Sequence, residues 1–245
     1  MAVGTAPKNT LQRDAPQRDA PLSEEDVCAR VRDSVLEQRL TPGTKLTEES
    51  LCAVFGVGRT TIRRAFLLLK RDNIIELQKN RGAVVASPSP EEARQVFESR
   101  TLVETALLAA TIKTIRPYDI NRLRGHLLDE KSALENAKIA RWIRLTGEFH
   151  LHLAKLAGND IMYAFLEQLV FQTSLIVALY GPGGAGPNCS GEDHKKLVEA
   201  LEQGNHEQAS RILIEHLNTI ETQLEFAPKK PFSDLQTVFS EARSA

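Results

Sequence analysis

The segment LTPGTKLTEESLCAVFGVGRTTIRRAFLLLKRDNIIELQKNRGAVV, residues 40–85, carries the signals of two short helices and a hairpin. Thr47 can cap the first helix, because its hydroxyl can accept a hydrogen bond from a free amide of the first turn. Gly56 can end that helix, and a second helix is predicted over residues 59–71. The inward-facing residues of the second helix recur at helical spacing and are Ile62, Ala65, Phe66 and Leu69.

The residues on either side complete a compact unit. Downstream, residues 74–86 place β-branched residues around a polar turn at 79–82, which predicts a two-stranded hairpin. Upstream, residues 24–40 repeat apolar residues at helical spacing until the sequence TPG interrupts them. Three helices and a two-stranded wing over residues 23–87 predict a winged helix-turn-helix.

Positive charge gathers on the predicted helix 59–71 and on the hairpin. Seven Lys or Arg residues between positions 59 and 81 face only two acidic residues, whereas the whole chain has a net charge of -1. Arg59 and Arg63 lie one helical turn apart, so both guanidinium groups can reach a guanine or a phosphate from one face. Thr60 and Thr61 belong to the first turn, where hydroxyls and free backbone amides can bind phosphate oxygens. The pattern predicts a DNA-reading helix.

The composition excludes several classes of protein. The chain has 245 residues, enough for two domains, and 42% hydrophobic with 26% charged residues is typical of a soluble globular protein. Its three cysteines lie far apart without a CxxC pair, which argues against disulfides and a Cys-rich zinc site and favours a reducing cytoplasm. No apolar run reaches the ~18 residues of a membrane span, and the first residues lack the apolar core of a signal peptide.

The remaining sequence divides into an arm, a bundle and a tail. Residues 1–22 contain QRDAP twice and almost no large apolar residue, so a disordered arm is expected there. Beyond a Pro- and Ser-rich break, six helices and no convincing strand are predicted between positions 91 and 225, interrupted by GPGGAGPN. Residues 88–227 are therefore expected to form an all-α bundle of six or seven helices, followed by a peripheral tail at 228–245 with room for one short helix. The predicted fold class is mainly α.

Residues 24–86, and above all the segment 40–85, resemble the winged helix-turn-helix of the GntR family of bacterial transcription regulators. The resemblance implies that the helix from Arg59 reads DNA and that the tip of the hairpin lies against a groove. The residues that it assigns to DNA contact are Arg59, Thr60, Thr61, Arg63, Arg81 and Gly82.

The chain departs from the family pattern at several of these places. Gly58 stands where the family commonly has Ser, which removes a side-chain cap and a phosphate donor. Thr61 and Arg64 replace the usual Pro and Glu. Glu49 occupies a position where some members carry a DNA-contacting arginine, so the operator preference of those members does not carry over.

Three histidines of the C-terminal half, His150, His194 and His216, fall on three different predicted helices. A bundle core can bring such side chains together, and imidazole is a good ligand for Zn, Ni, Cu or Fe. By spacing alone, a surface histidine or a satisfied core histidine is the more common outcome. The sequences FHLHLAKLAGN, EDH and EHL around them resemble the FCD ligand domain of the FadR subgroup of GntR regulators, over residues 91–225.

This second resemblance implies a ligand site. In metal-binding members of the subgroup, the three histidines join a carboxylate one turn before the first, and that position is Thr146 here. The resemblance implies one divalent transition metal, Zn or Ni, although a neutral hydroxyl is a weak ligand. Arg100 and Glu104 match residues of the subgroup's first bundle helix. Together with Thr146 they are the effector-binding candidates, and Arg100 would grip the carboxylate of a small organic acid. The alternative is an ordinary Arg–Glu pair on a helix surface.

The sequence therefore predicts a cytoplasmic, ligand-responsive bacterial transcription regulator, expected to be a repressor and not an enzyme. We expect a homodimer on a near-palindromic double-stranded DNA operator, because one winged domain reads only a few base pairs. The expected effector is a small carboxylate, and no membrane contact is expected. Two alternatives are a metal-dependent enzyme that uses the three histidines, although HExxH and paired Glu-x-x-His motifs are lacking, and an architectural DNA-binding protein that responds to no ligand.

Overall fold

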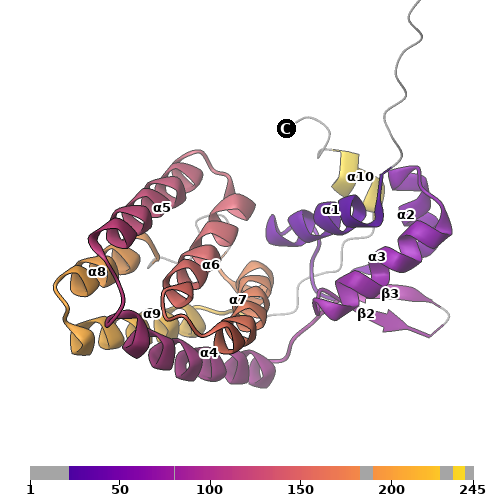
Figure 1. The fold of residues 1–245 in the computed structure, drawn as a ribbon. Coiled ribbons are helices and arrows are strands. Elements are labelled where there is room, and N and C mark those ends of the chain that lie inside the picture. Colours follow the sequence, from indigo (N-terminus) through magenta and orange to yellow (C-terminus); the bar gives the residue numbers. More distant parts are fainter. Residues whose placement is uncertain (1–21, 80, 183–189, 227–233, 241–245) are drawn as a thin grey trace, which may run out of the picture.

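The computed structural model describes residues 22–79, 81–182, 190–226 and 234–240. Over these residues the chain is mainly helical with one small sheet, which confirms the predicted fold class (Figure 1). The N-terminal elements are α1 (Glu24–Leu36), β1 (Lys45–Leu46), α2 (Glu48–Phe55), α3 (Arg59–Arg71), β2 (Ile75–Gln78) and β3 (Gly82–Val85). Those that follow are α4 (Pro90–Thr111), α5 (Pro117–Glu135), α6 (Ile139–Lys155), α7 (Asp160–Tyr180), α8 (Ser190–Glu202), α9 (His206–Thr222) and α10 (Leu235–Ser240).

Three segments that we expected to be irregular fall wholly or partly outside the described residues. These are the N-terminal arm at 1–22, the glycine-rich segment at 181–188 and the tail at 228–245. Leu22, the one arm residue inside the described part, packs against the hydrophobic core.

The helices of the winged unit begin and end where local hydrogen bonds are available. Ser23 and Asp26 form a capping box, in which each side chain accepts from the backbone amide of the other, and this box starts α1. Thr47 accepts from the amide of Ser50 at 3.1 Å and starts α2, as predicted. Gly56 ends α2 in the left-handed conformation with φ +66°. The turn between α2 and α3 is therefore encoded locally.

The wing is a three-stranded antiparallel sheet in the order β1-β3-β2. The predicted hairpin is present as β2 and β3, but β1 was not predicted, because two residues are too few for an alternating pattern. Gly82 lies against β1, where a Cβ atom would come within 2.5 Å of the Leu46 carbonyl oxygen, and its φ is +84°. Only glycine fits at the start of β3 without a shift of the backbone.

The six helices predicted for the C-terminal half are all present as α4 to α9. Helix α4 leads from the wing into this bundle and packs against α7 and α9, while α5 packs against α6 and α8 (Figure 1). Among the described helices, α7 alone is long and apolar enough to cross a membrane. It packs here against α1, α4 and α6 as one of the bundle helices.

Helix α10 returns from the end of the chain to the winged unit (Figure 1). Leu235, Val238 and Phe239 are buried, and the Phe239 ring meets Phe55 of α2 edge-on with the ring centroids 4.8 Å apart. Arg39, just after α1, donates a hydrogen bond to the Val238 carbonyl. The expectation of a peripheral segment was wrong for these residues, because the periodicity of one short helix does not show what it packs against.

Helix α1 also joins the winged unit to the bundle. Leu36, its last residue, belongs to the same buried cluster as Trp142 and Ile143 of α6. Asp33 forms an ion pair with Arg144, also on α6. The two halves of the chain therefore share a packed contact in addition to the covalent connection through α4.

Candidate effector pocket and nucleic-acid interface

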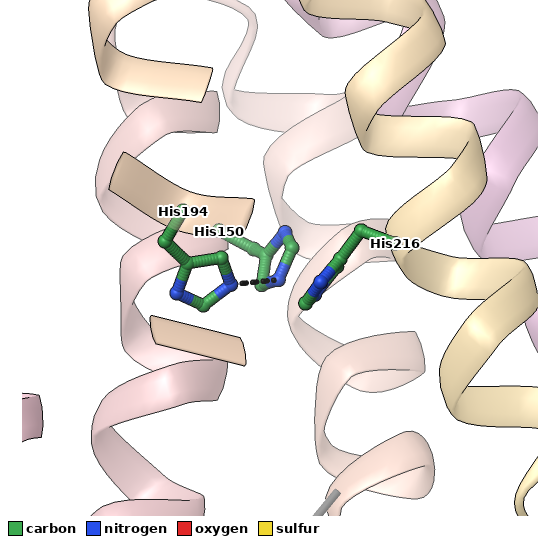
Figure 2. A group of neighbouring side chains, drawn as sticks. All are labelled: His150, His194 and His216. Atoms are coloured by element: carbon green, nitrogen blue, oxygen red, sulfur yellow. Dashed lines mark hydrogen bonds between the residues drawn. The ribbon is translucent and has the colours of Figure 1, made fainter. Parts of the chain in front are cut away.

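Three histidines meet inside the bundle. His150 on α6, His194 on α8 and His216 on α9 are each at most 3% exposed, and their candidate ligand atoms all lie within 4.8 Å of one another (Figure 2). The Nε2 atoms of His150 and His194 are 3.2 Å apart. His194 lies 44 positions after His150 in the sequence, and His216 lies farther still. The three residues therefore meet only because separate helices pack together.

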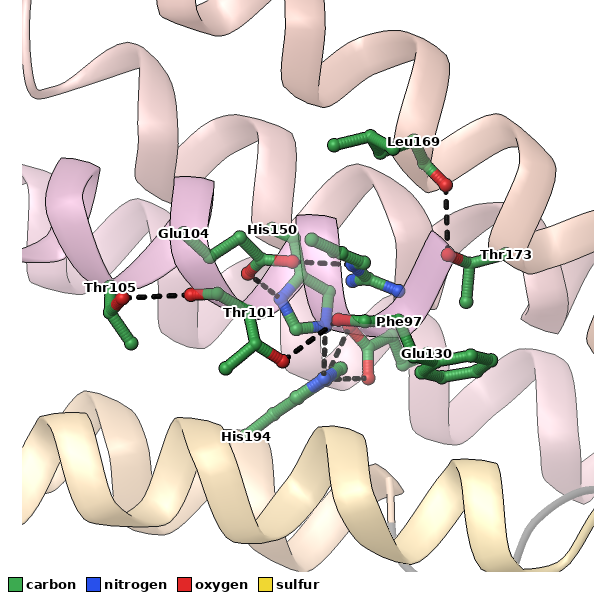
Figure 3. A network of polar contacts seen from close by, with 10 residues as sticks. Phe97, Thr101, Glu104, Thr105, Glu130, His150, Leu169, Thr173 and His194 are labelled. Atoms are coloured by element: carbon green, nitrogen blue, oxygen red, sulfur yellow. Dashed lines mark hydrogen bonds and ion pairs between the residues drawn. The ribbon is translucent and has the colours of Figure 1, made fainter. Parts of the chain in front are cut away.

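Each of these rings is held at Nδ1 by a carboxylate. The three pairs are His150–Glu104 at 2.7 Å, His194–Glu130 at 3.0 Å and His216–Asp193 at 3.4 Å. Figure 3 shows the first two pairs side by side between the helices. A carboxylate at Nδ1 favours a proton on that nitrogen, which leaves the lone pair of Nε2 available.

Burial keeps the three imidazoles neutral. It lowers the pKa of His150 well below 6.5, that of His194 to about 3 and that of His216 to about 4. The positive charge of Arg100 acts in the same direction on all three rings. Burial has the opposite effect on Glu130, whose pKa rises to about 7. Neutral imidazole is the form that binds a metal ion.

These donors fit a divalent transition metal. Buried, neutral imidazoles whose second nitrogens are bound to carboxylates are the usual protein ligands of Zn and related ions. Thr146 lies one turn before His150, and its hydroxyl donates to the Ile143 carbonyl at 3.0 Å. The threonine thus supplies no negative charge, and the protein offers three nitrogen donors.

Arg100 and Glu104 lie beside the histidines, 3% and 4% exposed. The Nε of Arg100 donates to one carboxylate oxygen of Glu104, while the other oxygen is the partner of His150. The alternative of a solvated pair on a helix surface is therefore wrong. Within the described part of the chain, the Nη2 of Arg100 is buried and has no hydrogen-bond partner. Such a group is costly to bury, so its surroundings favour an anionic acceptor.

A small cavity adjoins these groups. Arg100, His150 and His216 are among its lining residues, and its volume is about 30 Å³, enough for an ion or one or two water-sized groups. Thr146 also lines the cavity. The apolar part of the wall is formed by Trp142, Ile143, Val177 and Ile220. A larger ligand would have to displace part of this wall.

Four of the six predicted DNA-reading residues line a groove between α2, α3 and the wing. Its lining includes Arg59, Arg63, Arg81 and Gly82. Thr60 and Thr61, which are not part of this lining, lie in the first turn of α3, where Gly58 makes no side-chain cap and leaves amides available. Glu48 and Glu49 of α2 line the same groove. The groove therefore combines cationic groups with two carboxylates at one edge.

Two family models match the chain. Residues 23–85 match the model described as bacterial regulatory proteins, gntR family, and residues 95–219 match the FCD domain. The chain belongs to the GntR family. It is a DNA-binding transcription regulator with an FCD domain and not an enzyme.

Known proteins of the GntR family align with most of the chain. The HTH-type transcriptional repressor RspR of Escherichia coli (strain K12) is 22% identical over 190 residues, which are 78% of this chain and 83% of RspR. The Uxu operon regulator of Haemophilus influenzae is 29% identical over 205 residues, with 74% of each chain covered. A putative GntR transcriptional regulator from Rhodococcus sp. RHA1 has the same fold, with a TM-score of 0.70 and 23% identity over 84% of this chain and 99% of that one.

Sequence reasoning about this GntR regulator missed two carboxylates of the pocket, Glu130 and Asp193. Asp193 directly precedes His194 and was visible as part of the EDH string. Glu130 comes from α5 and reaches His194 only because α5 packs against α8. No local pattern in the sequence indicates that contact.

Proposed function

We propose that this GntR regulator binds a small carboxylate in its bundle, together with a divalent transition metal such as Zn or Ni, and that this binding changes its affinity for operator DNA. The observation that carries the proposal is a cluster of three neutral imidazoles beside a small cavity, which two of them, His150 and His216, line together with Arg100, whose Nη2 is buried and unpaired among the described residues. The histidines favour a cation and the arginine favours an anion. A carboxylate bound to a metal satisfies both.

The residues of the pocket have distinct roles in this proposal. His150, His194 and His216 would hold the metal, which when bound supplies a Lewis-acid centre for a carboxylate oxygen. Arg100 donates from Nη2 to the acid, while Nε stays on Glu104. Because Glu104 bonds both Arg100 and His150, it fixes the position of the anion-binding arginine relative to the metal-binding histidine.

The small size of the cavity suggests how effector binding is coupled to the DNA-binding unit. An acid with several carbon atoms does not fit in about 30 Å³, so its binding displaces the wall that contains Trp142 and Ile143. These residues share a buried cluster with Leu36 of α1. Packed clusters change between discrete arrangements rather than deforming continuously, so a shift of α6 moves α1 and the winged unit with it.

The DNA-binding part of the proposal rests on the groove beside α3. Arg59 and Arg63 would contact bases or phosphates, and Thr60 and Thr61 would bind phosphate oxygens with the first-turn amides. Arg81 would reach a neighbouring groove from the wing, where Gly82 permits the close backbone turn. We expect the protein to bind a near-palindromic operator as a homodimer. This homodimer would act as a repressor in the cytoplasm, where bacterial DNA lies.

A homodimer would cover an apolar surface that the chain leaves exposed. Leu102 on α4 and Ile161 with Phe165 on α7 are all more than half exposed, and α4 packs against α7. Exposed apolar groups on two adjoining helices are typical of protein interfaces. This face is our candidate dimer interface.

Native mass spectrometry tests the pocket directly. We expect the mass of a dimer with bound Zn or Ni. We also expect a bound acid, either one that co-purifies or citrate added as the probe. His194→Ala should lose the metal, whereas Arg100→Ala should keep the metal and lose the acid. A wild-type protein that takes up neither metal nor acid would contradict the proposal.

A further inference from the structure

We propose that Glu48 is a positioning residue for DNA reading, which holds Nε of Arg63 so that the two terminal amino groups of this arginine face a base pair. Glu48 is the first residue of α2, and Arg63 lies in the second turn of α3. The helix-turn-helix brings them together across 15 positions, with Glu48 Oε1 and Arg63 Nε 2.8 Å apart. The inference rests on the proposed role of Arg63 in DNA contact.

The contact with Glu48 uses only one end of the Arg63 guanidinium and leaves the other end available for DNA. A guanidinium has five N–H donors, and only the one on Nε is used by Glu48. The remaining pair of amino groups is the fork that binds guanine O6 and N7. The Arg63 side chain is 65% exposed, so without a partner it would sample many rotamers before DNA binds. A partner that holds one rotamer reduces the entropy that is lost when DNA binds.

The carboxylate also acts against non-specific binding. Glu48 lines the groove that faces the phosphates, so its negative charge weakens attraction to any duplex. A residue that weakens binding to all sequences and orients one base contact increases discrimination between sequences. Its value to the regulator is therefore in specificity rather than in total affinity.

Glu49 is a matched control that the chain itself provides. It lies in the same first turn of α2 and lines the same groove. Glu48 is joined to Arg63 by a hydrogen bond and an ion pair. Among the described residues, the Glu49 side chain makes neither kind of contact. Removal of either glutamate changes the groove charge and the helix start alike, but of these two glutamates Glu48 is the one whose side chain pairs with Arg63 in the described structure.

The experiment uses a duplex selected by the wild-type protein from a random-sequence library, and single-base-pair variants of it. Competition fluorescence anisotropy with Arg63→Ala first identifies the base pair that Arg63 reads. We expect Glu48→Ala to lose about tenfold discrimination at that base pair, with unchanged or tighter binding to unrelated duplex. Glu49→Ala should shift binding to unrelated duplex similarly and keep the discrimination. Glu48→Gln should keep most of it, because the amide oxygen still accepts from Nε.

A second variant covers the possibility that alanine disturbs the start of α2. Glu48→Asp keeps the charge at the helix start but shortens the reach, so it should lose discrimination as well. The inference is overturned if both Glu48→Ala and Glu48→Asp keep the wild-type discrimination, or if Glu49→Ala loses as much. If Arg63→Ala itself leaves every base preference intact, the DNA-reading role of Arg63 is wrong, which is a failure of the proposed function.

Discussion

Thr146 is the residue at which this pocket departs most clearly from the metal-binding pattern that the sequence resembles. Its hydroxyl is engaged with the carbonyl of Ile143 inside α6, so it brings no charge to the histidines. Carboxyl groups lie instead on the far side of the rings, where they hold each Nδ1, and burial raises the pKa of one of them, Glu130, to about 7. Outer carboxylates of this kind orient the rings and raise their basicity. The pocket therefore depends on packing between helices for its charge balance.

At this scale we predict that Thr146→Asp tightens metal binding about tenfold or more, because outer-shell carboxylates alone change metal affinity by ~10- to 100-fold. The matched control is Thr146→Val, which removes the hydroxyl and adds no ligand. Metal content after dialysis against a graded series of Zn concentrations measures the change. Equal affinity in the wild type and both variants would show that position 146 does not face the metal.

At the scale of helices and strands, local signals account for what the sequence revealed. The cap at Thr47 and the turn at Gly56 act within a few residues, so the sequence predicts them. The short strand β1 and the burial of α10 depend on contacts between distant segments, which no local pattern encodes. The same division holds in the pocket, where the three histidines were predicted and Glu130 was not.

One helix end offers a stability prediction. Ala137, two residues beyond the last residue of α5, lies in the left-handed region with φ +53°, a conformation that suits glycine. Ala137→Gly should raise the free energy of unfolding by about 0.5 to 1 kcal/mol, because relief of the strain outweighs the added freedom of the unfolded chain. Urea denaturation measures it. Gly158→Ala is the reverse control, since φ is +71° and a Cβ atom meets nothing within 4 Å, and it should destabilise. A destabilised Ala137→Gly would contradict the argument.

At the scale of the whole molecule, the buried histidines make folding sensitive to acid. The pKa values of His194 and His216 are about 3 and 4 in the folded protein, against 6.5 in an unfolded chain. Between these limits the unfolded chain binds protons that the folded protein does not, so stability falls as the pH drops from 6.5 towards 4. Glu130 opposes this trend between pH 7 and 4.5, because its raised pKa lets the folded protein bind a proton first.

We therefore predict that the thermal midpoint of the metal-free protein falls from pH 6.5 to pH 4, and that it falls more steeply in Glu130→Gln. The glutamine can still accept from His194 but no longer takes up the stabilising proton. Differential scanning calorimetry in the presence of a chelator provides the measurement. A midpoint that is independent of pH, or a shallower fall in the variant, would rule out this arrangement of neutral histidines.

The face formed by α4 and α7 leads to a prediction about assembly. Leu102→Glu on α4 should shift the protein from dimer to monomer at micromolar concentration, because it places a charge in the proposed interface. Leu128→Glu on α5 is the matched control, since both leucines are 68% exposed. Sedimentation velocity distinguishes the two. If both variants remain dimeric, the interface lies elsewhere.

In our proposal, ligand binding in the bundle pocket of this GntR regulator changes its affinity for operator DNA. The most direct measurement is fluorescence anisotropy of the selected operator duplex with the metal-stripped protein, with Zn or Ni restored, and with a panel of di- and tricarboxylates added. We predict that at least one acid changes the operator Kd at least about tenfold, within the usual range of allosteric coupling. Arg100→Ala should bind the operator like the wild type and lose this response. If no combination of metal and acid changes the operator Kd, or if Arg100→Ala retains the full response, the pocket does not control DNA binding.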